Sequence, residues 1–235
     1  MSTDWELAGV SSTFLARGSC HVPLFAVHIS DGVLSPVFLG LGFVIALVLI
    51  LPAMFRVDED EIPRIGLLTA AFFVASLIHV KLGVTSVHML LNGLVGVILG
   101  RRAPLAIIVA LGLQALLLGH GGFTSLGVNA VVMSIPALMA RLVFVLLVGR
   151  PPVLPHRTMI AGFVSGGLAV LVTVSLYALV LLVAGIEDFR IIATVGFVAY
   201  LPLAGIEAVI VGVATSYLAR VKPEMLGLTR SIRDS

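Results

Sequence analysis

The chain has 235 residues, of which 60% are hydrophobic and 11% charged, with a mean hydropathy of +1.20. So little polar surface excludes a soluble globular protein and indicates one that crosses a membrane several times. The net charge of +2 is small and the basic residues are scattered along the loops, which argues against nucleic acid as a partner.

Apolar segments follow one another along the chain and predict an all-α, single-domain integral membrane protein, a bundle of about seven hydrophobic helices. They cover residues 34–55, 65–80, 84–100, 103–119, 125–149, 159–185 and 191–219. The second, third and fourth are short for a hydrocarbon core of about 30 Å, so we expect tilted, re-entrant or buried segments there. Residues 27–226 are expected to form the membrane domain, and residues 227–235 a cytoplasmic tail.

The positive charges predict how the bundle is oriented. With the amino end outside, the inner loops collect ten Lys and Arg residues, whereas the outer loops hold only Lys81 and Arg190. Short cytoplasmic loops retain an excess of these residues. We therefore predict a multi-pass protein of a bacterial or archaeal cell membrane, with its amino end outside and its carboxyl end cytoplasmic.

The same topology places five of the six histidines outside, all except His156. Two of them lie in short motifs, His28 in Val-His-Ile-Ser-Asp-Gly and His88 in Gly-Val-Thr-Ser-Val-His. Neutral imidazole is the commonest metal ligand, so clustered histidine at the outer face predicts capture of a divalent metal.

Four stretches resemble the CbiM/NikM family, the substrate-capture subunits of energy-coupling-factor transporters for cobalt and nickel. They are residues 28–36, 83–91, 114–129, and 201–207 with 221–226. The resemblance implies that the chain takes up Co(II) or Ni(II) as its transported ligand and holds no permanent cofactor. It implies as partners a membrane coupling subunit, ATPase subunits and a small accessory membrane subunit.

The resemblance also implies the metal ligands. In that family the metal is held by the amino-terminal amine, by the amide nitrogen and imidazole of the second residue, and by the histidine of a Thr-Ser-x-His motif. Carried over, His28 and His88 supply the imidazoles and Val27 the amine. Such a tetragonal nitrogen field suits nickel and accommodates cobalt.

The 26 residues before Val27 depart from that pattern. Because valine codons include GTG, an alternative bacterial start, we expect Val27 to begin the native chain as methionine, with residues 1–26 a start-site artefact. Two alternatives stay open. Cleavage after Ala26 is weakly supported, because residues 1–26 lack the apolar stretch of a signal peptide. In a genuine extension, His21 and Cys20 would replace the amine as ligands.

Asp31, Thr85 and Ser86 are candidates to orient the imidazoles, since most metal-bound histidines have a second hydrogen-bonded partner. Helix capping is the alternative explanation for these residue types.

His79 and His120 are further candidates near the site. His79 precedes His88 across a predicted tight outer turn, and could be a fourth ligand or a gate; an interfacial capping role is the preferred reading. His120 stands where family members commonly show aspartate, and Tyr200 where a histidine is often found.

Arg141 and Glu207 are the clearly ionisable residues inside the predicted spans. Ionisable groups are costly in a bilayer unless they are paired or face the protein interior. We therefore predict that the two approach each other or share a polar network, and prefer a structural ion pair to a proton relay at Glu207.

Small residues permit close helix approach. By resemblance, Gly42 with Ala46 in the first segment is a candidate docking face for the coupling subunit. Packing within the chain explains the same spacing and carries more weight.

The sequence has no Gly-x-x-x-x-Gly-Lys phosphate loop and only two lysines, which excludes ATP binding by that route. Energy must then come from another subunit or from a gradient. A stand-alone secondary metal carrier is disfavoured by the near absence of carboxylates in the spans. An intramembrane enzyme is less supported still, because Ser165 has no identifiable base nearby in the sequence.

Overall fold

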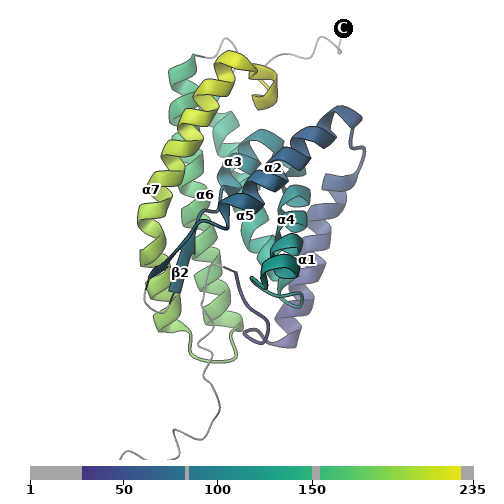
Figure 1. The fold of residues 1–235 in the computed structure, drawn as a ribbon, viewed down its shortest axis with the longest axis vertical. Coiled ribbons are helices and arrows are strands. Elements are labelled where there is room, and N and C mark those ends of the chain that lie inside the picture. Colours follow the sequence, from purple (N-terminus) through teal and green to yellow (C-terminus); the bar gives the residue numbers. More distant parts are fainter. Residues whose placement is uncertain (1–27, 83–84, 150–153, 229–235) are drawn as a thin grey trace, which may run out of the picture.

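The computed structural model describes residues 28–82, 85–149 and 154–228. These residues form an elongated bundle of seven α-helices with a short β-hairpin at its side (Figure 1). The helices are α1 (Pro36–Met54), α2 (Ile62–Ala75), α3 (Asn92–Leu99), α4 (Ala103–Leu118), α5 (Leu126–Val148), α6 (Pro155–Ala184) and α7 (Arg190–Val221). The strands are β1 (His79–Leu82) and β2 (Thr85–His88), and single 3-10 turns are η1 (Glu59–Glu61), η2 (Gly100–Arg102) and η3 (Pro223–Leu226).

Five stretches of the described chain are long and apolar enough to cross a membrane. They are α1, α5, α6, α7 and the stretch Asn92–Leu118, which joins α3 to α4 through η2. The multi-pass prediction is therefore supported with five candidate spans. The remaining helix, α2, has 14 residues, and about 20 are needed to cross a bilayer.

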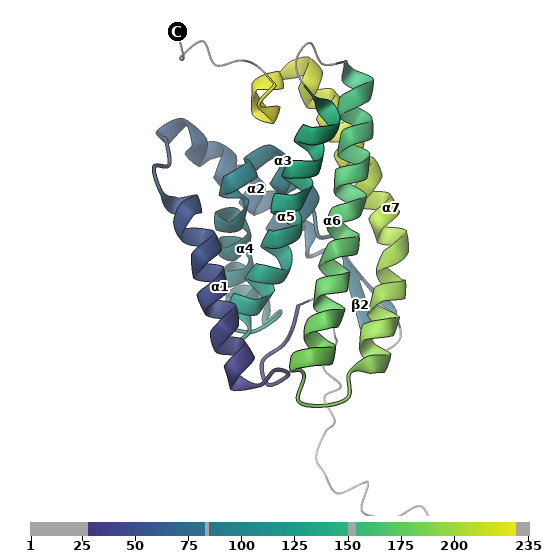
Figure 2. The ribbon, with the colours of Figure 1, turned by 180° about the vertical axis from the view of Figure 1, so that it is seen from behind.

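The short third segment is buried, as one of the sequence expectations had it. Seven of the eight residues of α3 are buried, whereas the buried residues of α1 are Gly42, Ala46 and Ala53 out of 19. Helix α3 therefore lies inside the bundle, whereas α1 presents most of its surface outward (Figure 2).

The prediction of continuous helices over 65–80 and 84–100 is wrong at the join between them. Helix α2 ends at Ala75, and β1 pairs antiparallel with β2, with His79 opposite His88 and Leu82 opposite Thr85. The hairpin contains β-branched residues, which favour strands. Strand pairing also satisfies backbone groups that no helix serves here.

Glycines set the close approach of several helices. A Cβ at Gly96 of α3 would overlap the carbonyl of Ala137 in α5, and a Cβ at Gly93 would lie 3.0 Å from the Cα of Gly166 in α6. These contacts bring α3 directly against α5 and α6.

The proposed docking face on α1 is not free for a partner. A Cβ at Gly42 would overlap Val128 of α5, and Ala46 is buried with 2% of its surface exposed. Gly42 therefore packs α1 against α5 and Ala46 is enclosed by the protein, which agrees with the alternative explanation given by the sequence.

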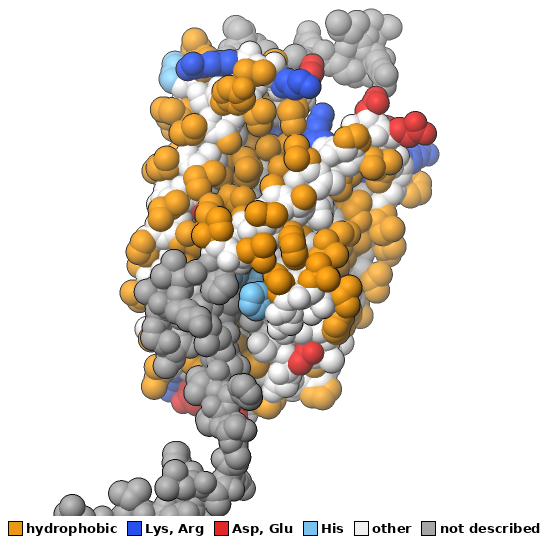
Figure 3. All heavy atoms as spheres, in the orientation of Figure 1, with side chains coloured by type: hydrophobic (Ala, Val, Ile, Leu, Met, Phe, Trp, Pro, Cys, Tyr) orange, Lys and Arg blue, Asp and Glu red, His pale blue; other side chains and the backbone are white. Residues whose placement is uncertain are grey.

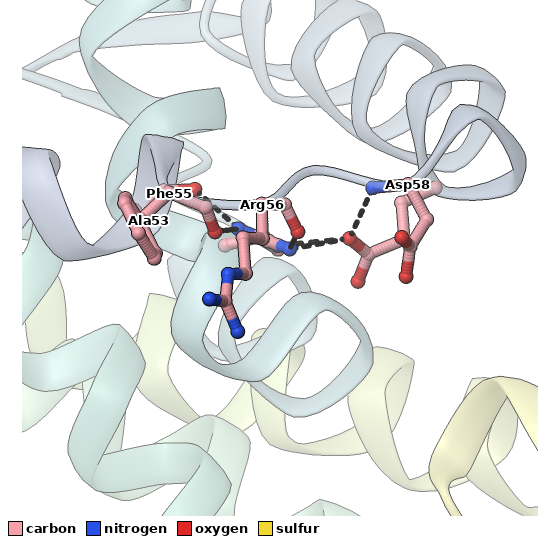
Figure 4. A network of polar contacts seen from close by, with 6 residues as sticks. Ala53, Phe55, Arg56 and Asp58 are labelled. Atoms are coloured by element: carbon pink, nitrogen blue, oxygen red, sulfur yellow. Dashed lines mark hydrogen bonds and ion pairs between the residues drawn. The ribbon is translucent and has the colours of Figure 1, made fainter.

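Arg102 fastens the connection between α1 and α2. It is 2% exposed and its Nη1 donates to the carbonyls of Ala53 and Phe55 at 2.8 and 2.9 Å. Its Nη2 donates to the Arg56 carbonyl, and its Nε and Nη2 to one carboxylate oxygen of Glu61. Figure 4 shows the hydrogen bonds that stabilise this loop. The carbonyls at the end of α1, which have no partner within the helix, are thus satisfied by one side chain.

The two ends of the bundle differ in charge. Hydrophobic side chains cover its flanks, while most Lys and Arg side chains on the face in Figure 3 gather at the end that carries η3 and the α1–α2 connection. The starts of α1, α5 and α7 lie at the opposite end (Figures 1 and 2).

Candidate metal centre

His28 begins a non-helical segment, residues 28–35, that lies against the amino end of α5 and turns at Asp31 and Gly32. Asn129 of α5 holds its backbone on both sides, because Ile29 N–H donates to Asn129 Oδ1 at 2.8 Å and Asn129 Nδ2 donates to the Ile29 carbonyl at 2.9 Å. The Ser125 hydroxyl donates to the same carbonyl at 2.6 Å. Backbone hydrogen bonds at its far end join the segment to the loop between α6 and α7. His28 is therefore fixed by helices distant in sequence.

Asp31 ties the same segment to the start of α5. Its Oδ1 accepts the N–H groups of Thr124 and Ser125 at 3.0 and 3.1 Å, and also the Thr124 hydroxyl. Partial burial raises the pKa of the Asp31 carboxyl, but these hydrogen bonds outweigh it and hold the pKa below its ordinary value. Asp31 thus serves the helix-capping alternative, at α5, and its hydrogen bonds are not directed to an imidazole.

Gly122 provides a direct test of the contact between Asp31 and the start of α5. A Cβ at position 122 would overlap the Asp31 carboxyl group, so Gly122→Ala is expected to lower the free energy of unfolding by about 1–3 kcal/mol, as overpacking does. Thermal unfolding in detergent, followed by circular dichroism, measures the change. Gly112→Ala is the matched control, because a Cβ there meets nothing within 4 Å. An equal loss in both variants would contradict the importance of this contact.

His88 ends β2, and the backbone that follows orients its ring. Nδ1 lies 3.0 Å from the carbonyl of Met89. Because a carbonyl can only accept, Nδ1 carries the proton and Nε2 carries the lone pair that a metal requires. From α7, the Tyr200 hydroxyl accepts the His88 N–H at 3.3 Å, and the two rings meet edge to face with 6.5 Å between centroids.

The two motif histidines, far apart in the sequence, meet in the structure. The rings of His28 and His88 stack with 4.8 Å between centroids and 17° between planes. They are 4% and 5% exposed, and neither ring nitrogen of His28 has a hydrogen-bond partner among the described residues. Burial, followed by the nearby imidazoles of His88 and His120, holds the pKa of His28 well below its usual range. The ring is therefore neutral at physiological pH, which is the form that binds metals.

Of the other candidate residues, the structure describes the side chain of His120 but not that of His79. His120 lies exposed in the loop between α4 and α5, near enough to His28 to influence it electrostatically. In the part of the chain that the structure describes, no three His, Cys, Asp or Glu side chains form a group suited to one metal ion. The side chains of His79, Thr85 and Ser86, whose backbone belongs to β1 and β2, lie outside what the structure describes. Val27, Cys20 and His21 lie outside the described residues altogether.

Arg141 and Glu207 do not form the predicted ion pair. Glu207 accepts hydrogen bonds from backbone N–H groups before α3, whereas Arg141 Nη1 donates to the carbonyl of Val97 near the end of α3 at 2.7 Å. The ion pairs among the described residues are Arg102 with Glu61 and Arg190 with Asp188. The ends of a short helix buried in the bundle thus supply partners for both residues.

Three side chains that hold the histidines were not assigned this role from the sequence: Asn129, Ser125 and Tyr200. Asn129 and Ser125 fall within the 114–129 stretch, where a polar residue at the start of an apolar helix is the available signal. In the sequence, Tyr200 differs from the histidine often found at this position in the family, which gives no sign of this role. Its hydroxyl reaches the backbone of His88, so the position still serves the site.

Residues 28–225 match a family model described as "CbiM: Cobalt uptake substrate-specific transmembrane region". The chain belongs to the CbiM family. Both motif histidines and all seven helices lie within the matched residues. Membership makes the chain a cobalt or nickel transport protein of the membrane and a transporter component, not an enzyme.

Relatives of this CbiM family member cover nearly its whole length. It is 34% identical over 206 residues to a "Putative metal transport protein" of Haemophilus influenzae, covering 87% of this chain and 99% of the relative. It is 32% identical over 213 residues to "Putative cobalt transport protein CbiM 1" of Methanocorpusculum labreanum, covering 85% and 92%. The solved structure of a transition metal transporter matches with a TM-score of 0.68 at 25% identity, covering 83% of this chain and 93% of that one.

Proposed function

We propose that the chain is the substrate-capture subunit of an energy-coupling-factor transporter and binds Co(II) or Ni(II) through His28 and His88. The observation that carries this proposal is the buried, stacked pair of imidazoles in a member of a cobalt and nickel transport family. The ion is the transported substrate and not a resident cofactor.

The geometry of the pair suits two ligands of one ion. Nitrogen-to-metal bonds are about 2 Å long, so two donors on one ion lie within about 4 Å of each other. The ring centroids of His28 and His88, 4.8 Å apart, bring the two imidazoles close to this range. The amide nitrogen of His28 and the nitrogen of Val27 complete the proposed tetragonal set; Val27 lies outside the described residues.

The distribution of charge supports capture from outside the cell. The segment that carries His28 contacts the start of α5 and the α6–α7 loop, at the end of the bundle opposite to the α1–α2 connection. Lys and Arg gather at the α1–α2 end (Figure 3), and such residues are retained on the cytoplasmic side. In this orientation the imidazole pair belongs to the outer half of the protein.

The proposed partners supply the energy for uptake. The sequence has no phosphate-binding loop, so ATPase subunits acting through a membrane coupling subunit would drive release to the inside. A small accessory membrane subunit completes the proposed assembly. The near absence of carboxylates in the spans fits this arrangement better than ion-coupled carriage.

Metal uptake by reconstituted vesicles tests this function. Vesicles holding the chain alone are expected to bind external nickel or cobalt without accumulating it, because the chain has no energy source of its own. Vesicles that also hold the coupling and ATPase subunits should accumulate the metal when ATP is enclosed. Gradient-driven accumulation by the chain alone would identify a secondary carrier instead, and His88→Ala serves as the binding control.

A further inference from the structure

The turn between β2 and α3, residues 89–91, connects His88 to the interior of the bundle. Leu91 in this turn has φ 48° and ψ 8°, the left-handed region that a leucine rarely adopts. It is also buried, with 9% of its surface exposed. A conformation of this kind persists only where the surroundings enforce it, and such positions concentrate at functional sites.

Glu207 of α7 enforces this turn. Its side chain is buried with 0% exposed, and its two carboxyl oxygens accept the N–H groups of Leu90 and Leu91, the latter at 3.0 Å. These N–H groups belong to the start of α3, where helix N–H groups lack partners within the helix and a negative charge is favoured. One side chain of α7 thus fixes the residues immediately after His88.

A single peptide group links Glu207 to the His88 ring. The peptide between Met89 and Leu90 presents its N–H to Glu207 and its carbonyl to Nδ1 of His88. Because the peptide is planar, fixing the direction of the N–H also fixes that of the carbonyl. A carboxylate on the N–H polarises the peptide and strengthens its carbonyl as an acceptor.

The same face of α7 also holds His88 directly. Tyr200 and Glu207 are separated by two helical turns and so lie on one side of the helix. Tyr200 accepts the N–H of His88 at 3.3 Å. Side chains of α7 therefore accept hydrogen bonds from three backbone N–H groups of residues 88–91.

We propose that Glu207 is a positioning residue of the metal site, which acts through the Met89–Leu90 peptide to set the tautomer and direction of the His88 imidazole. This inference rests on the proposed function. A group hydrogen-bonded to a metal-bound histidine raises its basicity and typically changes metal affinity 10–100-fold. Glu207 acts on the group in that place, the carbonyl of Met89, through the peptide that carries it.

The opposite end of α3 provides the control. Arg141 Nη1 donates to the carbonyls of Val97 and Leu226 at 2.7 and 3.0 Å, and so ties the far end of α3 to η3. A variant at Arg141 loosens the same helix without touching the turn at residues 89–91. It therefore separates general stability of α3 from control of the His88 ring.

The experiment compares Glu207→Gln with Arg141→Gln in the full-length chain, titrated in detergent with nickel or cobalt alone. Gln keeps the size of the side chain but turns one acceptor into an NH₂ donor facing a backbone N–H. We expect Glu207→Gln to weaken affinity by about 10–100-fold and to shift the visible absorption of the bound metal. Arg141→Gln should lower the melting temperature with affinity and spectrum unchanged.

Two further variants keep the test decisive. Glu207→Asp retains a carboxylate on a shorter side chain, and we expect an intermediate loss of affinity even if Glu207→Gln does not fold. Leu91→Gly removes the conformational restriction at position 91, so changes at Glu207 should cost less affinity in that background, as a double-mutant cycle would measure.

The outcomes separate the two levels of the argument. If the parent chain binds neither metal, the proposed function fails. If the parent binds and His88→Ala does not, but the Glu207 variants keep the parent's affinity and spectrum, the inference about Glu207 is overturned by itself. Equal effects from Arg141→Gln would overturn it too, because they would reduce Glu207 to a stabiliser of α3.

Discussion

Replacing His88 by alanine is expected to lower the affinity for nickel or cobalt by more than about a hundredfold. Loss of an outer partner of a metal-bound histidine already costs 10–100-fold, and a ligand itself contributes more. His28→Ala should have the same effect, because the two rings are stacked with 4.8 Å between their centroids and both are proposed as ligands of one ion. Isothermal titration of the purified chain with each metal measures both variants.

His156→Ala is the matched control for these two variants. His156 lies near the start of α6, at the end of the bundle opposite to the imidazole pair, and is exposed. The His156→Ala variant should bind metal with the same affinity as the parent chain. Retention of full affinity in either His28→Ala or His88→Ala would move the metal site elsewhere.

Replacing Arg102 by methionine is expected to lower the free energy of unfolding by about 1–3 kcal/mol, because buried backbone acceptors lose their hydrogen-bond donor. The change leaves the carbonyls of Ala53 and Phe55 without their donor and Glu61 without its cation. Thermal or denaturant unfolding in detergent measures the loss.

The Arg102 contact also carries a pH dependence. Hydrogen bonding from Arg102 holds the pKa of Glu61 below its ordinary value, despite the opposing effect of partial burial. The contribution of the Arg102–Glu61 pair to the free energy of unfolding is therefore complete above the ordinary pKa of glutamate and is lost as the pH falls through the lowered value.

Arg101→Met, at the exposed neighbouring position, should change stability by less than about 0.5 kcal/mol. A similar loss at both positions would contradict the role given to Arg102.

The long helices could be predicted from the sequence because apolar runs in a membrane protein have few alternative structures. The predicted segment 125–149 corresponds to Leu126–Val148 and 34–55 to Pro36–Met54. The hairpin at residues 79–88 was missed, since a short apolar run does not distinguish a strand from a buried helix. Apolar runs too short to cross a bilayer are therefore the ones whose secondary structure the sequence leaves open.

The meeting of His28 and His88 was anticipated from their motifs, but the side chains that hold them were not. Asn129, Tyr200 and Glu207 act on backbone groups far away in the sequence. Hydropathy carries no information about such contacts. The Arg141–Glu207 pair failed for a related reason, because the sequence does not reveal that α3 begins and ends inside the bundle.

X-ray absorption spectroscopy of the nickel-loaded chain tests the central claim most directly, since scattering from imidazole rings reports how many histidines bind the ion. The proposed site predicts two imidazoles at about 2 Å from nickel, with the signal of both lost or reduced when His28 or His88 is replaced. A spectrum with no imidazole, or one unchanged by either substitution, would contradict the account.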